Sequence, residues 1–219
     1  MSLMLYAHPF SSYCQKVLIA LYENGTPFEY RVLAPDDQQV AAELAALWPF
    51  KRFPVLVDAG RPIRESSIII EHLAVHHPGP LRLIPADAAA AVDVRFMDRC
   101  FDNYVMTPMQ KIVGDALRAS ERRDAQGVSD ARALLDTAYA WLDTTLAGRE
   151  WATGDSFSLA DCAAAPSLFY ADWAHPIDAR CGALVAYRRR LLARPSVARA
   201  VDEARPYRPF FPLGAPNRD

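Results

Sequence analysis

Phe53-Pro54-Val55-Leu56 and Glu65-Ser66 are the two stretches that decide the fold of this chain. Proline lacks the N–H group that a central strand needs, so Pro54 fits only just before a strand that begins at Val55. A cis Phe53–Pro54 bond would turn the preceding backbone outward, toward a ligand. Ser66 stands at the start of a helical run, where a serine hydroxyl and free N–H groups favour an anion. The corner therefore suits a peptide carboxylate.

Short elements alternate around these two stretches. The hydrophobic pattern predicts strands over 3–6, 30–33, 55–57 and 61–63, and helices over 12–24, 38–47 and 66–76. A β-α-β-α-β-β-α order is typical of an α/β layer fold. His77-Pro78-Gly79-Pro80 then interrupts the pattern. We therefore expect a first domain over 1–77 and a linker over 78–86.

Residues 87–219 show helical periodicity alone and are expected to form an all-helical second domain. The predicted helices cover 87–118, 129–147, 182–193 and 195–204, and one more begins near 158. Thr107-Pro108 should end or kink the first of them. Ser158 and Asp161 have the spacing of a capping box, and Phe157 can pack on Cys162 as a hydrophobic staple.

Composition excludes several classes of function. The chain has 219 residues, of which 52% are hydrophobic, and can bury a substantial core. A net charge of −2 gives no reason to expect nucleic acid or a membrane as a partner. Neither a signal peptide nor an apolar run of the ~18 residues that a membrane span needs is visible.

The cysteines and histidines point to a cytoplasmic protein without a metal. No C-x-x-C pair and no histidine at ligand spacing accompanies the cysteines, which favours reduced thiols over disulfides or structural zinc. These cysteines are Cys14, Cys100, Cys162 and Cys181. The five histidines form no dyad or metal pattern, and His76 and His77 are interpreted as a solvated helix end.

Taken in order, the two opening stretches, the linker and Phe157-Ser158-Leu159-Ala160-Asp161 resemble the cytosolic glutathione S-transferases over nearly the whole chain. The resemblance is to a serine-type, zeta-like and bacterial-looking member. It implies a thioredoxin-like N-terminal domain, an all-α C-terminal domain, a homodimer, and glutathione as co-substrate. The implied reaction is conjugation of glutathione to a small hydrophobic electrophile, as in detoxification.

Ser11-Ser12-Tyr13-Cys14 is the expected catalytic stretch. Matching the helix run 17–21 to the zeta-like pattern places Ser11 on the family's functional serine, where it would stabilise the glutathione thiolate by a hydrogen bond. Disulfide exchange would need a cysteine in that position. Ser11 as a plain helix cap, and Ser12 or Tyr6 as the donor, remain alternatives. Cys14 falls on an apolar helical stripe and is expected to pack.

The resemblance also implies the other contacts to glutathione. The backbone of Phe53 should pair with the cysteinyl unit as an added strand would. Glu65 and Ser66 should hold the γ-glutamyl ammonium and carboxylate. Gln39 and Lys51 are candidates for the glycyl carboxylate, with surface solvation as the alternative. The stretch 48–53 departs from the usual family sequence, which leaves the contacts at the glycyl end open.

The sequence says least about the pocket for the second substrate. By analogy its pocket would be formed by aromatic residues, although such residues at helical spacing more often belong to the core. The candidates are Phe10, Tyr13, Tyr104, Phe169 and Trp173. Two other functions stay open. One is a glutathione-dependent cis–trans isomerase of the maleylacetoacetate type; the other is a non-enzymatic ligand-binding or protein-interaction module, against which a complete peptide site argues.

Overall fold

Strand β1 (Leu3–Ala7) lies inside a four-stranded sheet in the computed structural model, which describes residues 3–219. It runs parallel to β2 (Phe28–Val32) and antiparallel to β3 (Val55–Asp58). Strand β3 forms a hairpin with β4 (Arg61–Arg64), so the order across the sheet is β2-β1-β3-β4. Strand β2 begins at Phe28, before the predicted start at residue 30.

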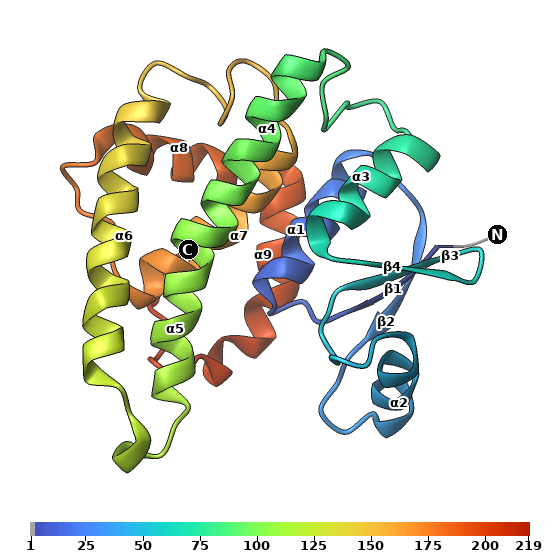
Figure 1. The fold of residues 1–219 in the computed structure, drawn as a ribbon, viewed down its shortest axis with the longest axis horizontal. Coiled ribbons are helices and arrows are strands. Elements are labelled where there is room, and N and C mark those ends of the chain that lie inside the picture. Colours follow the sequence, from blue (N-terminus) through green and yellow to red (C-terminus); the bar gives the residue numbers. More distant parts are fainter. Residues whose placement is uncertain (1–2) are drawn as a thin grey trace.

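Three helices cover the two faces of this sheet. Alternate residues of a strand point to opposite faces, so Leu5 of β1 faces helices α1 (Ser12–Glu23) and α3 (Ser66–His76), while Tyr6 packs with residues of α2 (Gln38–Leu47). In Figure 1, α2 lies on the far side of the sheet from the helical domain. This arrangement confirms the predicted thioredoxin-like N-terminal domain.

Helix α7 (Leu159–Ala174) is the centre of the all-helical domain and is buried along its whole length. Helix α1 packs against it, which joins the two domains into one core. The other α-helices of this domain are α4 (Ala88–Cys100), α5 (Thr107–Ala116), α6 (Ala125–Leu146), α8 (Gly182–Leu192) and α9 (Pro195–Ala204). None of the helices within residues 3–219 has the length and apolarity that crossing a bilayer requires.

The predicted kink before Pro108 is a π-helical turn, η1 (Phe101–Met106), which connects α4 to α5 without ending the helix. The N–H of Thr107 donates to the carbonyl oxygen of Asp102, five residues back, and the Thr107 hydroxyl donates to the same oxygen at 3.0 Å. Proline has no N–H to continue the α-helical ladder, and the wider turn accommodates that loss.

Helix α7 begins with the predicted capping box. The backbone N–H and the hydroxyl of Ser158 both donate to Oδ2 of Asp161, each at 2.9 Å. The other carboxylate oxygen accepts from Ala152 N at 2.8 Å and from the Tyr187 hydroxyl at 2.6 Å. Burial raises the pKa of Asp161 and these hydrogen bonds lower it. The box therefore anchors the central helix and lies inside the core.

A buried ion cluster ties α1 to the helical domain. The ammonium of Lys16, whose side chain is 1% exposed, lies 2.5 Å from Oδ1 of Asp98 and 2.8 Å from Oδ2 of Asp102. It also donates to the hydroxyl of Ser67 on α3 at 2.9 Å. Arg99, half exposed, contacts the same two carboxylates from the solvent side. Two cations thus balance two buried anions across the domain boundary.

Replacing Lys16 by Met should lower the free energy of unfolding by ~3–5 kcal/mol, because it leaves buried carboxylates without their main partner. Burial already raises the pKa of Asp102, helped by Asp98 and opposed by Lys16 and Arg99. A raised carboxyl pKa means that the folded state binds protons more tightly than the unfolded chain. Because Lys16 lowers the pKa of Asp102, that pKa rises further in the variant. Protonation at low pH then stabilises the variant more than the wild type, and the loss of stability shrinks as the pH falls.

Denaturant unfolding at several pH values measures this effect. Lys111→Met is the matched control, because the Lys111–Asp124 ion pair is more than one third exposed on both sides and should contribute less than ~1 kcal/mol. Equal losses in the two variants would contradict a central role for Lys16.

Candidate active site

A cavity of about 760 Å³ opens between the N-terminal ends of α1 and α3 and the helical domain. Its floor comes from the thioredoxin-like domain and includes Phe53-Pro54 and Glu65-Ser66. Its walls come from α4, η1, α5, α7 and the C-terminal segment. The lining residues from the first domain are Phe10, Ser11, Ser12, Tyr13, Trp48, Lys51, Arg52, Phe53, Pro54, Glu65 and Ser66.

Ser11 is the N-cap residue of α1, yet its side chain makes no capping hydrogen bond. Its backbone fixes its position: the N–H donates to His8 O at 3.0 Å, and the carbonyl accepts from Gln15 N at 2.9 Å. The first N–H groups of a helix have no partner within the helix. The Ser11 hydroxyl lies next to the buried Cys14 thiol, and both this hydroxyl and the first N–H groups of α1 can donate to a ligand in the cavity.

Cys14 and Tyr6, the other groups considered for the chemistry, are held elsewhere. Cys14 is fully buried, and burial raises the pKa of its thiol to about 12, although the neighbouring Ser11 hydroxyl and His8 N–H lower it. The thiol therefore stays protonated at neutral pH. Tyr6 faces α2, where its hydroxyl donates to Glu43 at 3.0 Å, and it does not line the cavity.

The backbone at Phe53 is available for pairing. The Phe53–Pro54 peptide bond is cis, and β3 begins directly after it at Val55. Within residues 3–219, no hydrogen bond involves the N–H or the carbonyl of Phe53. An extended peptide that lies along this edge can pair with both groups as an added strand.

Backbone strain is concentrated around the cavity. Glu65, the N-cap of α3, has a φ of 67°, and Lys51 has a φ of 52°. Of the three non-glycine residues with positive φ in the described chain, only Ala59 in the β3–β4 turn lies away from the cavity. Each such residue costs on the order of 1–3 kcal/mol, and such strain is kept where it positions functional groups.

Asp102 brings the ion cluster to the cavity wall, which the sequence analysis did not anticipate. Asp102 and Arg99 both line the cavity, and the Oδ1 atom of Asp102 is buried without a hydrogen-bond partner in residues 3–219. Two signals in the sequence were available: a lysine, Lys16, beside the apolar run 17–21, and two aspartates, Asp98 and Asp102, at i, i+4 spacing.

The aromatic candidates for the second substrate divide into two groups. Phe10 and Tyr13 line the cavity, whereas Tyr104, Phe169 and Trp173 do not. Phe169 and Trp173, one helical turn apart on α7, are both buried with ring centroids 4.6 Å apart, because every face of that helix is covered. Tyr104, in the π turn, points into a separate groove beside α6.

Other residues supply the wall on this side. Tyr170 of α7 lines the cavity and accepts a hydrogen bond from Gln15 Nε2 at 3.0 Å. The remaining wall residues come from η1, α5 and the C-terminal segment: Asn103, Met109, Gln110, Val113, Leu117, Phe210, Phe211 and Pro212.

The two candidates for the glycyl carboxylate are also separated. Lys51 lines the cavity together with Arg52, so two cationic side chains border this end. Gln39 does not line it: the side-chain amide donates to Oε1 of Glu43 at 3.1 Å on the exposed face of α2. Its position one turn before Glu43 on that helix favours this local hydrogen bond.

Known proteins share both halves of this architecture. Residues 5–81 match the model of the glutathione S-transferase N-terminal domain, and residues 102–190 match that of the C-terminal domain. The glutathione S-transferase-like protein LUC7 of a Fusarium species is 31% identical over 75% of this chain and 74% of its own length. Glutathione S-transferase U25 of Arabidopsis thaliana is 26% identical over 92% of this chain and 90% of its own.

A solved structure agrees over a similar range. The glutathione S-transferase of Methylobacterium radiotolerans, in complex with glutathione sulfonate, has a TM-score of 0.79 and 30% identity over 92% of this chain and 95% of that one. The described fold, the cavity and these matches lead to one conclusion: the chain belongs to the glutathione S-transferase family.

Proposed function

We propose that this protein binds glutathione in the 760 Å³ cavity and holds its sulfur as a thiolate for conjugation to a small hydrophobic electrophile. The observation that carries the proposal is the Ser11 hydroxyl, which lines the cavity at the start of α1 without a capping bond. In the reaction the thiolate forms a C–S bond to an electrophilic carbon. In a substitution, the bond from that carbon to the leaving group breaks and the leaving group keeps the electron pair. In an addition, the electron pair of the attacked double bond takes up a proton.

The thiolate is favoured by electrostatics at the start of α1. The pKa of a free thiol is ~8.5, and lowering it by ~1–2 corresponds to about 1.4–2.7 kcal/mol. One hydroxyl donor together with unpaired N–H groups at a helix start can supply this stabilisation. Ser11 acts as a hydrogen-bond donor and keeps its own proton. The protonated, buried Cys14 takes no part, which disfavours disulfide exchange.

Residues of the first domain, 1–77, together with Asp102 of the helical domain, would hold the peptide. The ammonium of the γ-glutamyl unit lies near Glu65 and the free oxygen of Asp102, and its carboxylate lies at Ser66 and the start of α3. The cysteinyl unit pairs with the backbone of Phe53. Lys51 and Arg52 border the place of the glycyl carboxylate, and Gln39 has no part in this arrangement.

The helical domain, residues 87–219, would supply the second-substrate side. Part of its cavity wall is apolar, with Met109, Val113 and Leu117 on one face of α5 and at its end. Apolar side chains at i, i+4 and i+8 form a continuous stripe along α5. A hydrophobic electrophile suits this wall, which favours conjugation over isomerisation of a charged diacid.

The protein is further proposed to form a homodimer through a groove between α4, η1 and α6. Three large aromatic side chains on it are strongly exposed: Phe96 (55%), Tyr104 (53%) and Trp141 (41%). Monomeric proteins rarely leave clustered aromatic side chains in water, so a second copy of the chain is expected to cover them.

Replacing Ser11 by Ala should raise the pKa of bound glutathione toward that of the free thiol and lower kcat/KM by roughly 10–100-fold, since 1.4 kcal/mol is tenfold. Thiolate absorbance across pH measures the first effect and steady-state kinetics the second. Ser12→Ala is the matched control. If the Ser12 variant loses the thiolate and the Ser11 variant keeps it, Ser12 is the donor in place of Ser11. If neither variant loses the thiolate, the proposed mechanism fails.

Replacing Asp102 by Asn should weaken glutathione binding by roughly 10–100-fold, because a hydrogen bond to a charged group is worth about 1.5–3 kcal/mol. A glutathione analogue without the α-amino group should bind equally to wild type and variant in calorimetry. Asp98→Asn is the control, since Asp98 belongs to the same ion cluster but does not line the cavity. An equal effect of both substitutions would make the role of Asp102 purely structural.

Replacing Trp141 by Glu should convert the dimer into monomers, because a carboxylate would be buried in an apolar interface. Sedimentation velocity checks this. Val185→Glu, on α8 and 42% exposed, is the control and should leave the association state unchanged. A monomeric wild-type protein would refute the proposed dimer.

A further inference from the structure

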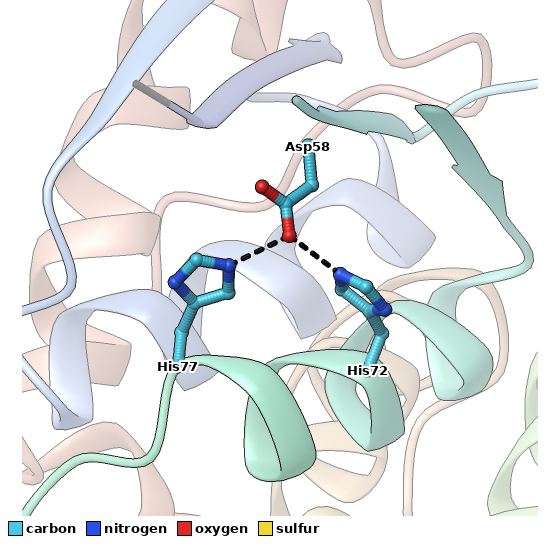
Figure 2. A group of neighbouring side chains, drawn as sticks. All are labelled: Asp58, His72 and His77. Carbon is cyan, nitrogen blue, oxygen red and sulfur yellow. Dashed lines mark hydrogen bonds and ion pairs between the residues drawn. The ribbon is translucent and has the colours of Figure 1, made fainter. Parts of the chain in front are cut away.

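Asp58, His72 and His77 converge on one point at the edge of the thioredoxin-like domain, far from the cavity. The Nε2 atom of His72 lies 2.8 Å from Oδ2 of Asp58, and that of His77 lies 2.7 Å from the same oxygen. Figure 2 shows both imidazole rings pointing at this carboxylate oxygen from α3 and its end. The expectation that the histidines form no dyad or metal pattern is therefore corrected, because Asp58 and the two histidines meet only through the fold.

The three side chains are fixed by regular structure and remain accessible. Asp58 is the last residue of β3, His72 lies in α3, and His77 is the C-cap residue of that helix. Their side chains are 18%, 11% and 30% exposed, respectively. Rigid elements thus hold the ligand atoms in place while solvent still reaches them, as an exchangeable ion requires.

The charge balance leaves room for a cation. Within residues 3–219 only His72 and His77 form hydrogen bonds or ion pairs with the Asp58 carboxylate, and no lysine or arginine side chain does. One potential ligand atom from each of the three residues lies within 4.8 Å of the others.

We propose that Asp58, His72 and His77 bind one divalent first-row transition ion of the Zn²⁺, Co²⁺ or Ni²⁺ class. Two imidazole nitrogens and one carboxylate oxygen suit these ions, whereas Mg²⁺ and Ca²⁺ prefer oxygen ligands alone. Tetrahedral bonds of ~2.0–2.1 Å place ligand atoms about 3.3 Å apart. The imidazoles must therefore move outward by about half an ångström from their hydrogen-bonded positions, and water completes the coordination.

The ion would be structural. Helix α3 has 11 residues, so its end at His76 lies roughly 16 Å from Ser66 at the cavity. An ion at Asp58, His72 and His77 joins the end of β3 to the end of α3 and does not reach the thiol. Binding should therefore stabilise the fold and leave the pKa of bound glutathione unchanged, so this inference stands or falls independently of the proposed function.

The test is a titration of the chelator-treated full chain with the metal alone. Glutathione is left out because its thiol binds the same ions. Calorimetry with Zn²⁺ should give one ion per chain, and Tm should rise with Zn²⁺ concentration. Co²⁺ should give the visible bands of a tetrahedral site without the near-ultraviolet thiolate band. Absence of stoichiometric binding, or a thiolate band that assigns the ion to a cysteine, would overturn the proposal.

Single substitutions locate the ion. Metal binding should weaken by at least ~10-fold in each of Asp58→Asn, His72→Ala and His77→Ala. This is the smallest effect on metal affinity expected even for a group that only hydrogen-bonds to a ligand. His175→Ala is the control, because His175 pairs with Asp136 at 2.7 Å, and no second histidine of the described chain, 3–219, pairs with that carboxylate. It should bind the ion as wild type does, and an equal loss would refute the assigned site.

A competing arrangement on α3 needs its own variant. His76 lies one helical turn after His72, with ring centroids 4.4 Å apart, and this pair could bind an ion on the exposed helix face. The proposal expects His76→Ala to retain binding. If His76→Ala abolishes binding while Asp58→Asn and His77→Ala preserve it, the ion belongs to that pair and the proposal is wrong.

Discussion

The buried ammonium of Lys16 is the interaction on which the arrangement of the two domains depends. Asp98 and Asp102 would repel each other in a dry interior, and Lys16 reaches across from α1 to lie between them at hydrogen-bonding distance. Because Ser67 joins the same cluster, α1, α3, α4 and η1 are drawn to one point. The cavity opens directly beside that point, so the contact that joins the domains also builds the wall of the site.

Two helix starts meet at this cavity and give it its character. Helices α1 and α3 each begin with a serine on its lining, and each brings unpaired N–H groups toward the same space. Glu65 enters α3 through a strained backbone conformation, which directs the start of the helix toward the ligand. A ligand with a thiol and several carboxylates matches these donors, and the apolar stripe of α5 faces it from the other domain.

Local signals in the sequence carry most of the fold. The strands and helices around Phe53–Leu56, the start of α3 and the Ser158–Asp161 box depend on spacing within a few residues, and the structure contains all of them. Contacts between segments that are distant in the sequence could not be predicted from it. Periodicity indicates that a residue such as Phe169 or Tyr170 is buried, but not which neighbour covers it. Asp58 and His77 illustrate the same limit, since only the sheet and α3 bring them together.

The π turn at Phe101–Met106 shows why the cavity wall for the second substrate was hard to predict from the sequence. It also separates the part of the chain that holds the peptide from the face of α5 that would contact the second substrate. A π turn contains one residue more than the α-helix that it interrupts. Losing that residue would rotate everything after it by about 100° about the helix axis. The face of α5 in the cavity would then change as a unit, while the peptide-holding groups of the thioredoxin-like domain would stay where they are. In this scaffold, a one-residue insertion or deletion is a route by which lineages can diverge in substrate range without re-evolving recognition of the shared co-substrate.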